Sequence, residues 1–170
     1  SRMYADVGYM QDFIDSAQCD RPLVLCEYTH AMGNSCGDVA DYWNLIYTRD
    51  ELMGGFVWEY TNHAIKTDKG YLYGGDNGEE LHDGNFCVDG LVYPDRRPHT
   101  GLLEYKNVNR PCRIVSFNQK NGELILHNYL DFTDLANQIR IGYRVERDGV
   151  LLEGGVIPFK SVAPHTDGKA

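Results

Sequence analysis

The sequence lacks an excess of basic residues, and this lack excludes two classes of partner. Its 170 residues include 16 Lys and Arg against 25 Asp and Glu, which gives a net charge of −9. Binding to nucleic acid or to an anionic membrane requires a basic face, and the adjacent pair Arg96-Arg97 is too short to form one. No apolar run approaches the roughly 18 residues of a membrane span. We therefore expect neither a nucleic acid nor a membrane as partner.

The sequence also lacks the cysteine spacing of zinc sites and disulfide scaffolds. No two cysteines form a CxxC pair, and their odd total is unsuited to complete pairing. The five are Cys19, Cys26, Cys36, Cys87 and Cys112. We interpret them as small buried or half-buried thiols of a protein in a reducing compartment, and we expect a cytoplasmic location.

Apolar residues are plentiful at 42% of the chain, so the protein is expected to be globular, with one large domain or two small ones. The first third predicts the order helix, strand, helix, strand, at residues 8–18, 23–26, 39–49 and 56–60. The first strand is continuously apolar, which is typical of a parallel strand covered on both faces. Together these elements predict a βαβ unit of a parallel sheet.

Periodicity and capping signals define the two predicted helices. The first has an apolar stripe at Met10, Phe13, Ile14 and Ala17, and the second has one at Val39, Tyr42, Trp43 and Ile46. The run from Ser35 to Asp38 resembles a capping box ahead of the second helix. The pair Gly54-Gly55 is expected to end this helix before the second strand begins.

The rest of the sequence changes character twice. Residues 61–112 are rich in glycine and turn signals, and we predict a long, mostly irregular segment there. From about residue 113 the apolar residues alternate, which predicts about four antiparallel strands. Two hairpins are expected, at Asn121-Gly122 and Asp148-Gly149.

Polar side chains follow the two predicted parallel strands. Glu27 ends the first strand, with His30 and Asn34 in the loop that follows it, and Trp58 and Glu59 lie near the end of the second. Reactive groups of parallel α/β folds lie at such strand ends. A carboxylate here suits proton transfer or attack on an anomeric carbon, and an indole offers a flat face to a sugar ring. Trp58 and Glu59 alternate, so one of them is expected to face away from the site.

Each of these residues also has a simpler interpretation. A lone Glu27 fits a solvated strand end, a lone His30 fits a loop histidine, and Trp58 fits core packing. Only their convergence on one edge of the sheet favours a catalytic site.

Four motifs closely resemble the β-galactosidases of glycoside hydrolase family 2. The resemblance extends from about residue 19 to 118, and more loosely to 165, and it is strongest in the first of the motifs. They are "RPLVLCEYTHAMGNS" (21–35), "GGFVWEY" (54–60), "YGGD" (73–76) and "NFCVDGLVYPDRRPH" (85–99).

The resemblance implies an α/β fold for residues 1–112, the C-terminal part of a (β/α)8 TIM barrel with its connecting loops. For residues 113–170 it implies a truncated, all-β immunoglobulin-like sandwich. It further implies retaining hydrolysis of terminal β-D-galactosides such as lactose, with β-glucuronides as a neighbouring substrate class. Glu27 would be the nucleophile, His30 would contact the galactose hydroxyls, and Trp58 would form the floor of the sugar pocket. Glu59 gains no catalytic role.

The family's cofactors are Mg²⁺ and Na⁺. The resemblance implies a sodium site at the backbone carbonyl of Phe86 and the side chain of Asp89, where the family has asparagine. Aspartate keeps the oxygen ligand and adds a charge, so a harder cation is an alternative. The family's magnesium ligands lie upstream of the matching segment and have no counterpart here.

The resemblance leaves the catalytic pair incomplete. A retaining mechanism needs a second carboxyl group, which the family takes from an Asn-Glu pair that is absent from this sequence. We therefore expect a slice of a longer protein, a homo-oligomer when complete, and predict that the isolated chain folds poorly and has little or no activity. The alternative is a non-catalytic protein that binds sugars or docks onto a partner supplying the remainder of the barrel.

Overall fold

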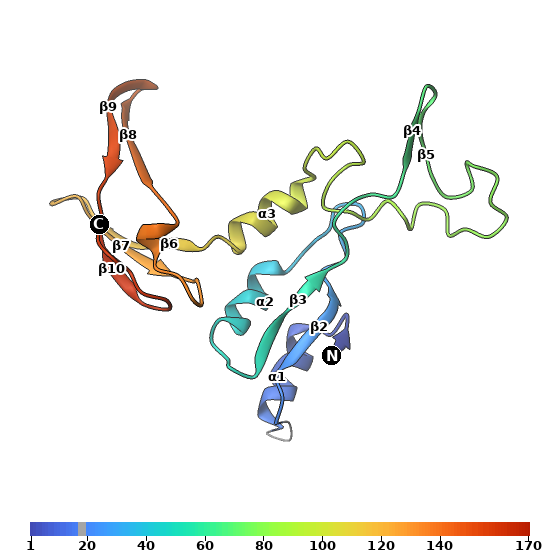
Figure 1. The fold of residues 1–170 in the computed structure, drawn as a ribbon, viewed down its shortest axis with the longest axis horizontal. Coiled ribbons are helices and arrows are strands. Elements are labelled where there is room, and N and C mark those ends of the chain that lie inside the picture. Colours follow the sequence, from blue (N-terminus) through green and yellow to red (C-terminus); the bar gives the residue numbers. More distant parts are fainter. Residues whose placement is uncertain (17–19) are drawn as a thin grey trace. The chain divides into compact units, whose positions relative to one another are not determined.

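The computed structural model describes residues 1–16 and 20–170 and divides the chain into two compact units (Figure 1). Unit 1 comprises Ser1–Asn109 and unit 2 comprises Arg110–Ala170. Two residues of the sequence analysis, Ala17 and Cys19, lie outside the described residues. No helix among the described residues is long and apolar enough to cross a bilayer.

Unit 1 is built on a three-stranded parallel sheet. Its strands are β1 (Arg2–Met3), β2 (Leu23–Tyr28) and β3 (Leu52–Val57), in the order β1-β2-β3. The predicted parallel pairing is confirmed, and β2 lies between its neighbours (Figure 1). Strand β1 was not predicted, because two residues are too few to show a period.

The second predicted strand was placed too late in the sequence. We expected it at residues 56–60, after a helix-ending glycine pair, but β3 ends at Val57 and contains both glycines. Gly54 has a φ of +122°, which favours glycine. A Cβ on Gly55 would lie 2.9 Å from Cδ1 of Tyr28, so this position requires close backbone approach. The two glycines therefore serve packing inside a strand.

Two helices, α1 (Val7–Asp15) and α2 (Val39–Ile46), cover one face of the sheet (Figure 1). Both predicted stripes are confirmed over their described residues. The core that they form with the strands contains Met10, Leu23, Leu25, Tyr28, Ile46 and Leu52. The predicted capping box is wrong, because Asp38 is the N-cap of α2 with a φ of +59° and its side chain makes no capping hydrogen bond.

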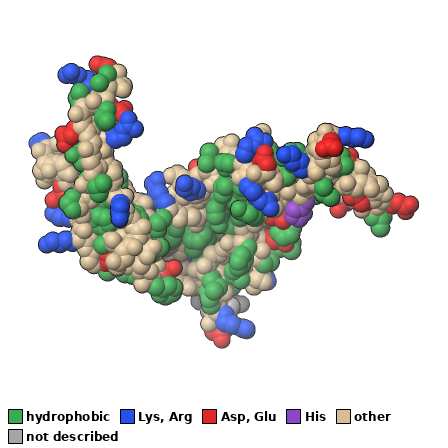
Figure 2. Space-filling view, turned by 45° about the horizontal axis from the view of Figure 1, so that its top comes forward, with side chains coloured by type: hydrophobic (Ala, Val, Ile, Leu, Met, Phe, Trp, Pro, Cys, Tyr) green, Lys and Arg blue, Asp and Glu red, His purple; other side chains and the backbone are tan. Residues whose placement is uncertain are grey.

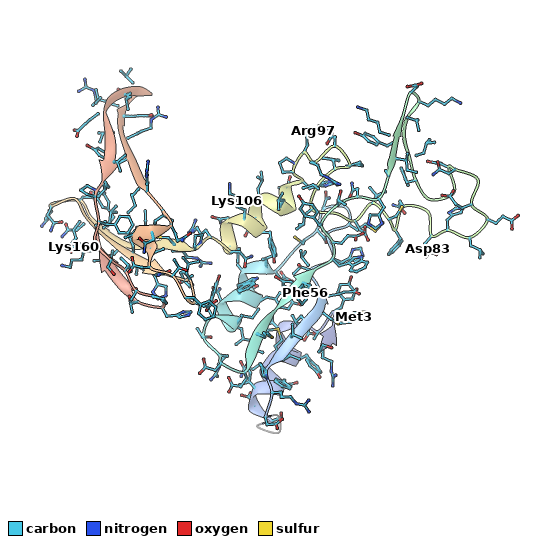
Figure 3. All side chains as sticks on the ribbon, in the orientation of Figure 1. Met3, Phe56, Asp83, Arg97, Lys106 and Lys160 are labelled. Atoms are coloured by element: carbon cyan, nitrogen blue, oxygen red, sulfur yellow. The ribbon has the colours of Figure 1, made fainter. Side chains whose placement is uncertain are left out.

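The same strands expose large apolar side chains that no helix covers. Met53 of β3 is 71% exposed and Phe56 is 68% exposed, and Met3 of β1 is 60% exposed. Figure 3 shows Met3 and Phe56 extending from the two outer strands. Leu25 and Leu52 belong to the core under the helices, whereas the residues that follow them, Cys26 and Met53, are exposed, so the second face of the sheet is open. In the space-filling view of Figure 2, hydrophobic side chains reach the surface of the molecule.

The segment between β3 and unit 2 contains more structure than the sequence predicted. A hairpin is formed by β4 (Ile65–Thr67) and β5 (Gly70–Leu72), and helix α3 spans Thr100–Val108. Most of residues 61–112 is irregular, as predicted, and these three elements are the part that the prediction did not specify. Helix α3 was missed because it buries only Val108 fully, so its sequence shows a weak apolar stripe.

Unit 2 is antiparallel. Strands β6 (Cys112–Asn118), β7 (Glu123–Asn128) and β10 (Asp167–Lys169) form a sheet in the order β10-β7-β6, and β8 (Ile141–Arg147) pairs with β9 (Val150–Ile157).

Both predicted hairpins are confirmed, and in the second one Asp148 and Gly149 have φ values of +52° and +79°, as a tight hairpin turn requires. A short 3₁₀ helix, η1 (Leu135–Asn137), contributes Leu135 to a core with Leu126 and Val162. The immunoglobulin-like assignment of this unit stays a prediction.

Candidate active site

The candidate site lies where β1 and β2 end. Glu27 is the penultimate residue of β2, and Tyr4 directly follows β1. The two strands are parallel and Met3 is paired with Glu27. The Tyr4 amide donates a 2.8 Å hydrogen bond to the Glu27 carbonyl. This register places a tyrosine beside the predicted nucleophile.

The backbone turns sharply just beyond both strands. Tyr4 has a φ of +50° and Thr29, one residue after β2, has a φ of +45°. This left-handed conformation is uncommon for residues other than glycine, and such residues gather at functional sites. The two turns direct the following residues across the strand ends.

The Tyr4 phenol faces a cluster of carboxylates. Its pKa is raised above the ordinary value, first by partial burial and then by a side-chain hydrogen bond with Glu27. The negative charges of Glu27, Asp89 and Glu59 raise it further. The phenol therefore keeps its proton and can donate it in a hydrogen bond to the Glu27 carboxylate. Tyr4 is a site residue that the sequence analysis missed.

Asp89 connects two of the predicted sugar-contacting residues. The indole Nε1–H of Trp58 donates a 3.1 Å hydrogen bond to Asp89 Oδ2. His30 Nε2 lies 3.5 Å from the same oxygen. Asp89 is 2% exposed, whereas Trp58 is 38% exposed. A buried carboxylate thus anchors the edge of an indole whose ring remains accessible.

Contacts on both ring nitrogens orient His30. The Met32 amide donates to Nδ1 at 3.4 Å, so the hydrogen of the neutral imidazole is on Nε2, facing Asp89. The ring centroid of His30 lies 5.8 Å from that of Tyr4 and 6.3 Å from that of Phe86. His30 therefore lies between Tyr4 on one side and Phe86 and Asp89 on the other.

Glu59 also belongs to this cluster. Its amide donates to the Asp89 carbonyl at 3.1 Å, and its carboxyl group lies 3.2 Å from His63 Nε2. Burial raises the pKa of Glu59, a hydrogen bond with Asp89 adds to the rise, and His63 opposes it. The expectation that Trp58 or Glu59 would face away is wrong. Alternation holds inside a strand, and both residues follow the end of β3.

A close backbone approach holds Asp89 in place. Beyond β3 the chain runs beside the segment that follows Asp89, with the Leu91 amide donating to the Glu59 carbonyl at 2.8 Å. Asn62, which is 4% exposed, accepts a 2.7 Å hydrogen bond from the Gly90 amide. A Cβ on Gly90 would lie 2.2 Å from the Asn62 nitrogen, so only glycine permits this approach.

A cavity of about 530 Å³ borders the cluster and shares Phe86 and His63 with it. Phe86 is 64% exposed. The rest of the cavity's lining comes mainly from strands β4 and β5 and from the loop after them, which includes Asp83, labelled in Figure 3. Asn34, by contrast, lines a different cavity of about 350 Å³ near the start of α3 and does not join the cluster.

Asp89 fits one part of the predicted cation site. Its Oδ1 is buried and has no hydrogen-bond partner, so it is free to coordinate a cation. Its Oδ2 faces the N–H groups of Trp58 and His30, which would repel a cation. Among the described residues, no three His, Cys, Asp or Glu side chains are arranged to hold a metal ion. Further ligands would have to be carbonyls, such as that of Phe86, or other groups.

The thiols differ in their exposure. Cys36 is buried, Cys87 and Cys112 are half-buried, and all three are free. Cys26, also free, is exposed, contrary to expectation, because it lies on the open face of the sheet. The described cysteines therefore include no disulfide.

Comparison with known proteins decides the family. Residues 1–114 match the model described as "Glycosyl hydrolases family 2, TIM barrel domain". The chain belongs to glycosyl hydrolase family 2. It is 48% identical to a β-galactosidase of Actinobacillus pleuropneumoniae over 98% of this chain and 16% of the relative. It is 42% identical to a β-galactosidase of Staphylococcus xylosus, over 98% of this chain and 17% of the relative.

A β-galactosidase of Kluyveromyces lactis is 41% identical over 69% of this chain and 12% of the relative. The chain thus spans about one sixth of the length of the first two family 2 relatives. The match to a TIM barrel domain agrees with the parallel sheet of unit 1, in which helices cover one face and the polar cluster lies at the strand ends.

Proposed function

We propose that this chain is part of a retaining β-galactosidase and carries its nucleophile, Glu27. The observation that supports this most directly is the position of Glu27, at the end of the central parallel strand and beside the Tyr4 phenol. The names of the family 2 relatives supply the substrate class, terminal β-D-galactosides.

In the proposed reaction the Glu27 carboxylate attacks the anomeric carbon of the bound galactoside. The bond to the leaving oxygen breaks and a covalent galactosyl-enzyme forms, which water then hydrolyses with net retention. Tyr4 donates a hydrogen bond to Glu27, so it holds the carboxylate in position and stabilises it as the leaving group when the intermediate is hydrolysed.

The second carboxyl group of the mechanism has no assigned residue in this chain. It must protonate the leaving oxygen from about 5–5.5 Å away and later activate water. Glu59 lies in the cluster, but its carboxyl group is engaged by Asp89 and His63 and is not assigned this role. We propose that another part of the full-length protein supplies the acid/base group.

Sugar binding is assigned to the exposed groups of the cluster. Trp58 offers its ring face to the C–H groups of galactose, and His30 offers its Nε2–H to a hydroxyl. The unpartnered Oδ1 of Asp89 and the Phe86 carbonyl would hold a cation, which when bound would supply a positive charge for the 6-hydroxyl.

The replacement Glu27→Gln in the full-length protein tests this proposal. It keeps the shape of the side chain and removes the nucleophile, and we expect kcat for a β-galactoside to fall at least about 1,000-fold. Glu51→Gln is the matched control, because Glu51 is an exposed glutamate at the opposite end of the same sheet. A loss below about tenfold in Glu27→Gln would contradict the proposal. Binding of galactose without any hydrolysis by the unmodified protein would favour the non-catalytic alternative.

A further inference from the structure

The buried carboxylate of Asp89 has a geometry that a cation ligand does not require. Its Oδ2 receives the Trp58 indole N–H at 3.1 Å and faces His30 Nε2 at 3.5 Å. Both donors belong to side chains that line the open part of the site, whereas the acceptor is 2% exposed. We propose that Asp89 is a positioning residue that orients Trp58 and His30 for galactose; this inference rests on the proposed function.

Trp58 gains a defined ring orientation from this contact. The second side-chain torsion of tryptophan has a broad, roughly two-fold preference, so an unanchored indole can reverse its edges. The half-exposed ring of Trp58 is covered too little for packing alone to select one orientation. The hydrogen bond to Oδ2 selects the one in which the N–H edge points into the protein and the face remains open.

His30 gains a defined hydrogen position in the same way. The Met32 amide occupies Nδ1, and Asp89 lies next to Nε2, so the proton-bearing nitrogen is held at the edge of the site. The 3.5 Å separation from Oδ2 is longer than a normal hydrogen bond, which leaves this N–H able to turn toward a sugar hydroxyl. Asp89 therefore orients the ring face of Trp58 and the N–H donor of His30 toward the sugar, and it does not contact the sugar itself.

Asp89 lies on a segment that backbone contacts hold in place, as a positioning residue requires. Its carbonyl accepts from the Glu59 amide, and the next residue, Gly90, is held against the backbone of Asn62. A carboxylate fixed on such a segment can impose its position on more mobile side chains.

The experiment measures binding of D-galactose to the full-length protein by calorimetry, with Asp89→Ala, Asp89→Asn and Asn128→Ala. Asp89→Ala is expected to raise Kd about tenfold, the effect of losing a hydrogen bond to a charged group. Asp89→Asn keeps an oxygen for Trp58 and is expected to stay within about threefold of the unmodified protein. Asn128→Ala removes a fully buried polar side chain whose partners are backbone groups of unit 2, so its Kd should change little.

A second variant keeps the test valid if Asp89→Ala does not fold. Trp58→Phe removes the N–H donor and leaves Asp89 intact, and galactose binding should weaken as well. Trp43→Phe is its control, because it removes an indole hydrogen bond to the hydroxyl of buried Tyr28 and leaves the contact between Trp58 and Asp89 in place. In the double variant, the loss caused by Asp89→Ala should be smaller than in the unmodified background, as expected for residues that act as a pair.

The measurements are repeated with choline, which is too large for a sodium site, in place of sodium. This distinguishes a positioning role of Asp89 from a role as cation ligand. We expect the tenfold loss in Asp89→Ala to persist in choline. If the loss vanishes in choline, or if Asn128→Ala weakens binding as much as Asp89→Ala, the positioning role is overturned. An unmodified protein that binds no galactose would instead contradict the proposed function.

Discussion

Two buried polar side chains, Asn128 in unit 2 and Asp89 in unit 1, are satisfied in different ways. Asn128 is fully buried, donates to the carbonyls of Thr133 and Val162 at 2.9 Å each, and accepts from the Leu130 amide at 2.8 Å. All of its partners are backbone groups. Asp89 is bonded through Oδ2 to a side chain at the edge of an open site, and its Oδ1 has no partner.

The difference distinguishes a buried polar residue that stabilises the fold, Asn128, from one that serves the site, Asp89. A polar group that satisfies the backbone stabilises the fold, and its removal leaves buried groups unpaired. A buried carboxylate that holds exposed side chains and keeps one oxygen unsatisfied lowers the stability of the fold. Such a cost is expected where the residue serves the function of the site. Such a residue marks unit 1 as the unit that carries the site.

The largest effect on stability is expected at Asn128. Asn128→Ala would leave the Thr133 carbonyl and the Leu130 amide without partners and would remove one of two donors to the Val162 carbonyl. We therefore expect the free energy of unfolding of unit 2 to fall by about 2–4 kcal/mol. Hydrogen exchange of peptides from residues 110–170 measures this in the full-length protein. Galactose affinity should stay unchanged, and a parallel loss of affinity would remove the distinction drawn between the two residues.

Tyr4→Phe should have a smaller effect that is confined to catalysis. A hydrogen bond to a charged group contributes about 1.5–3 kcal/mol, so kcat is expected to fall about 10- to 100-fold while hydrogen exchange stays the same. Tyr9→Phe serves as control, because Tyr9 is similarly exposed on the same segment and its hydroxyl bonds Arg2 instead of Glu27. Equal losses in the two variants would show that the Tyr4 hydroxyl has no special role.

The smallest effect is the pH dependence caused by His99. Burial lowers the pKa of His99 below its ordinary value, and its Nε2 lies 3.2 Å from the Asn62 amide nitrogen. The unfolded state therefore binds a proton more readily, so the stability of this region is complete above about pH 6.5 and decreases as the pH falls below that value.

Hydrogen exchange of α3, corrected for intrinsic rates, should therefore show weaker protection at pH 5.5 than at pH 7.5. His99→Gln should remove this difference. Protection that is independent of pH in the unmodified protein would contradict the assignment.

The sequence predicted those parts of the fold that depend on local signals. Asp148-Gly149 predicted a hairpin because its turn needs positive φ, and the stripe of α2 predicted the face that packs on the sheet. The start of β3 was misplaced because Gly54 and Gly55 serve contacts with Trp43 and Tyr28, which no local pattern reveals.

The candidate site was predicted in its residues but not in its contacts. Glu27, His30 and Trp58 were selected from strand ends and family motifs, and the structure brings His30 and Trp58 to one oxygen of Asp89. Tyr4 could not be selected, because its position depends on β1 pairing with β2, a long-range contact. The prediction that Trp58 or Glu59 would face away rested on an alternation that ends with β3.

Trapping the covalent intermediate on the full-length protein tests most directly whether Glu27 is the nucleophile. A fluoro-galactoside with an activated leaving group serves, because the fluorine slows both steps and the leaving group restores the first. Peptide mapping is expected to find the fluorogalactosyl mass on Glu27. A label on Glu59, or hydrolysis of galactosides without any covalent label, would contradict it.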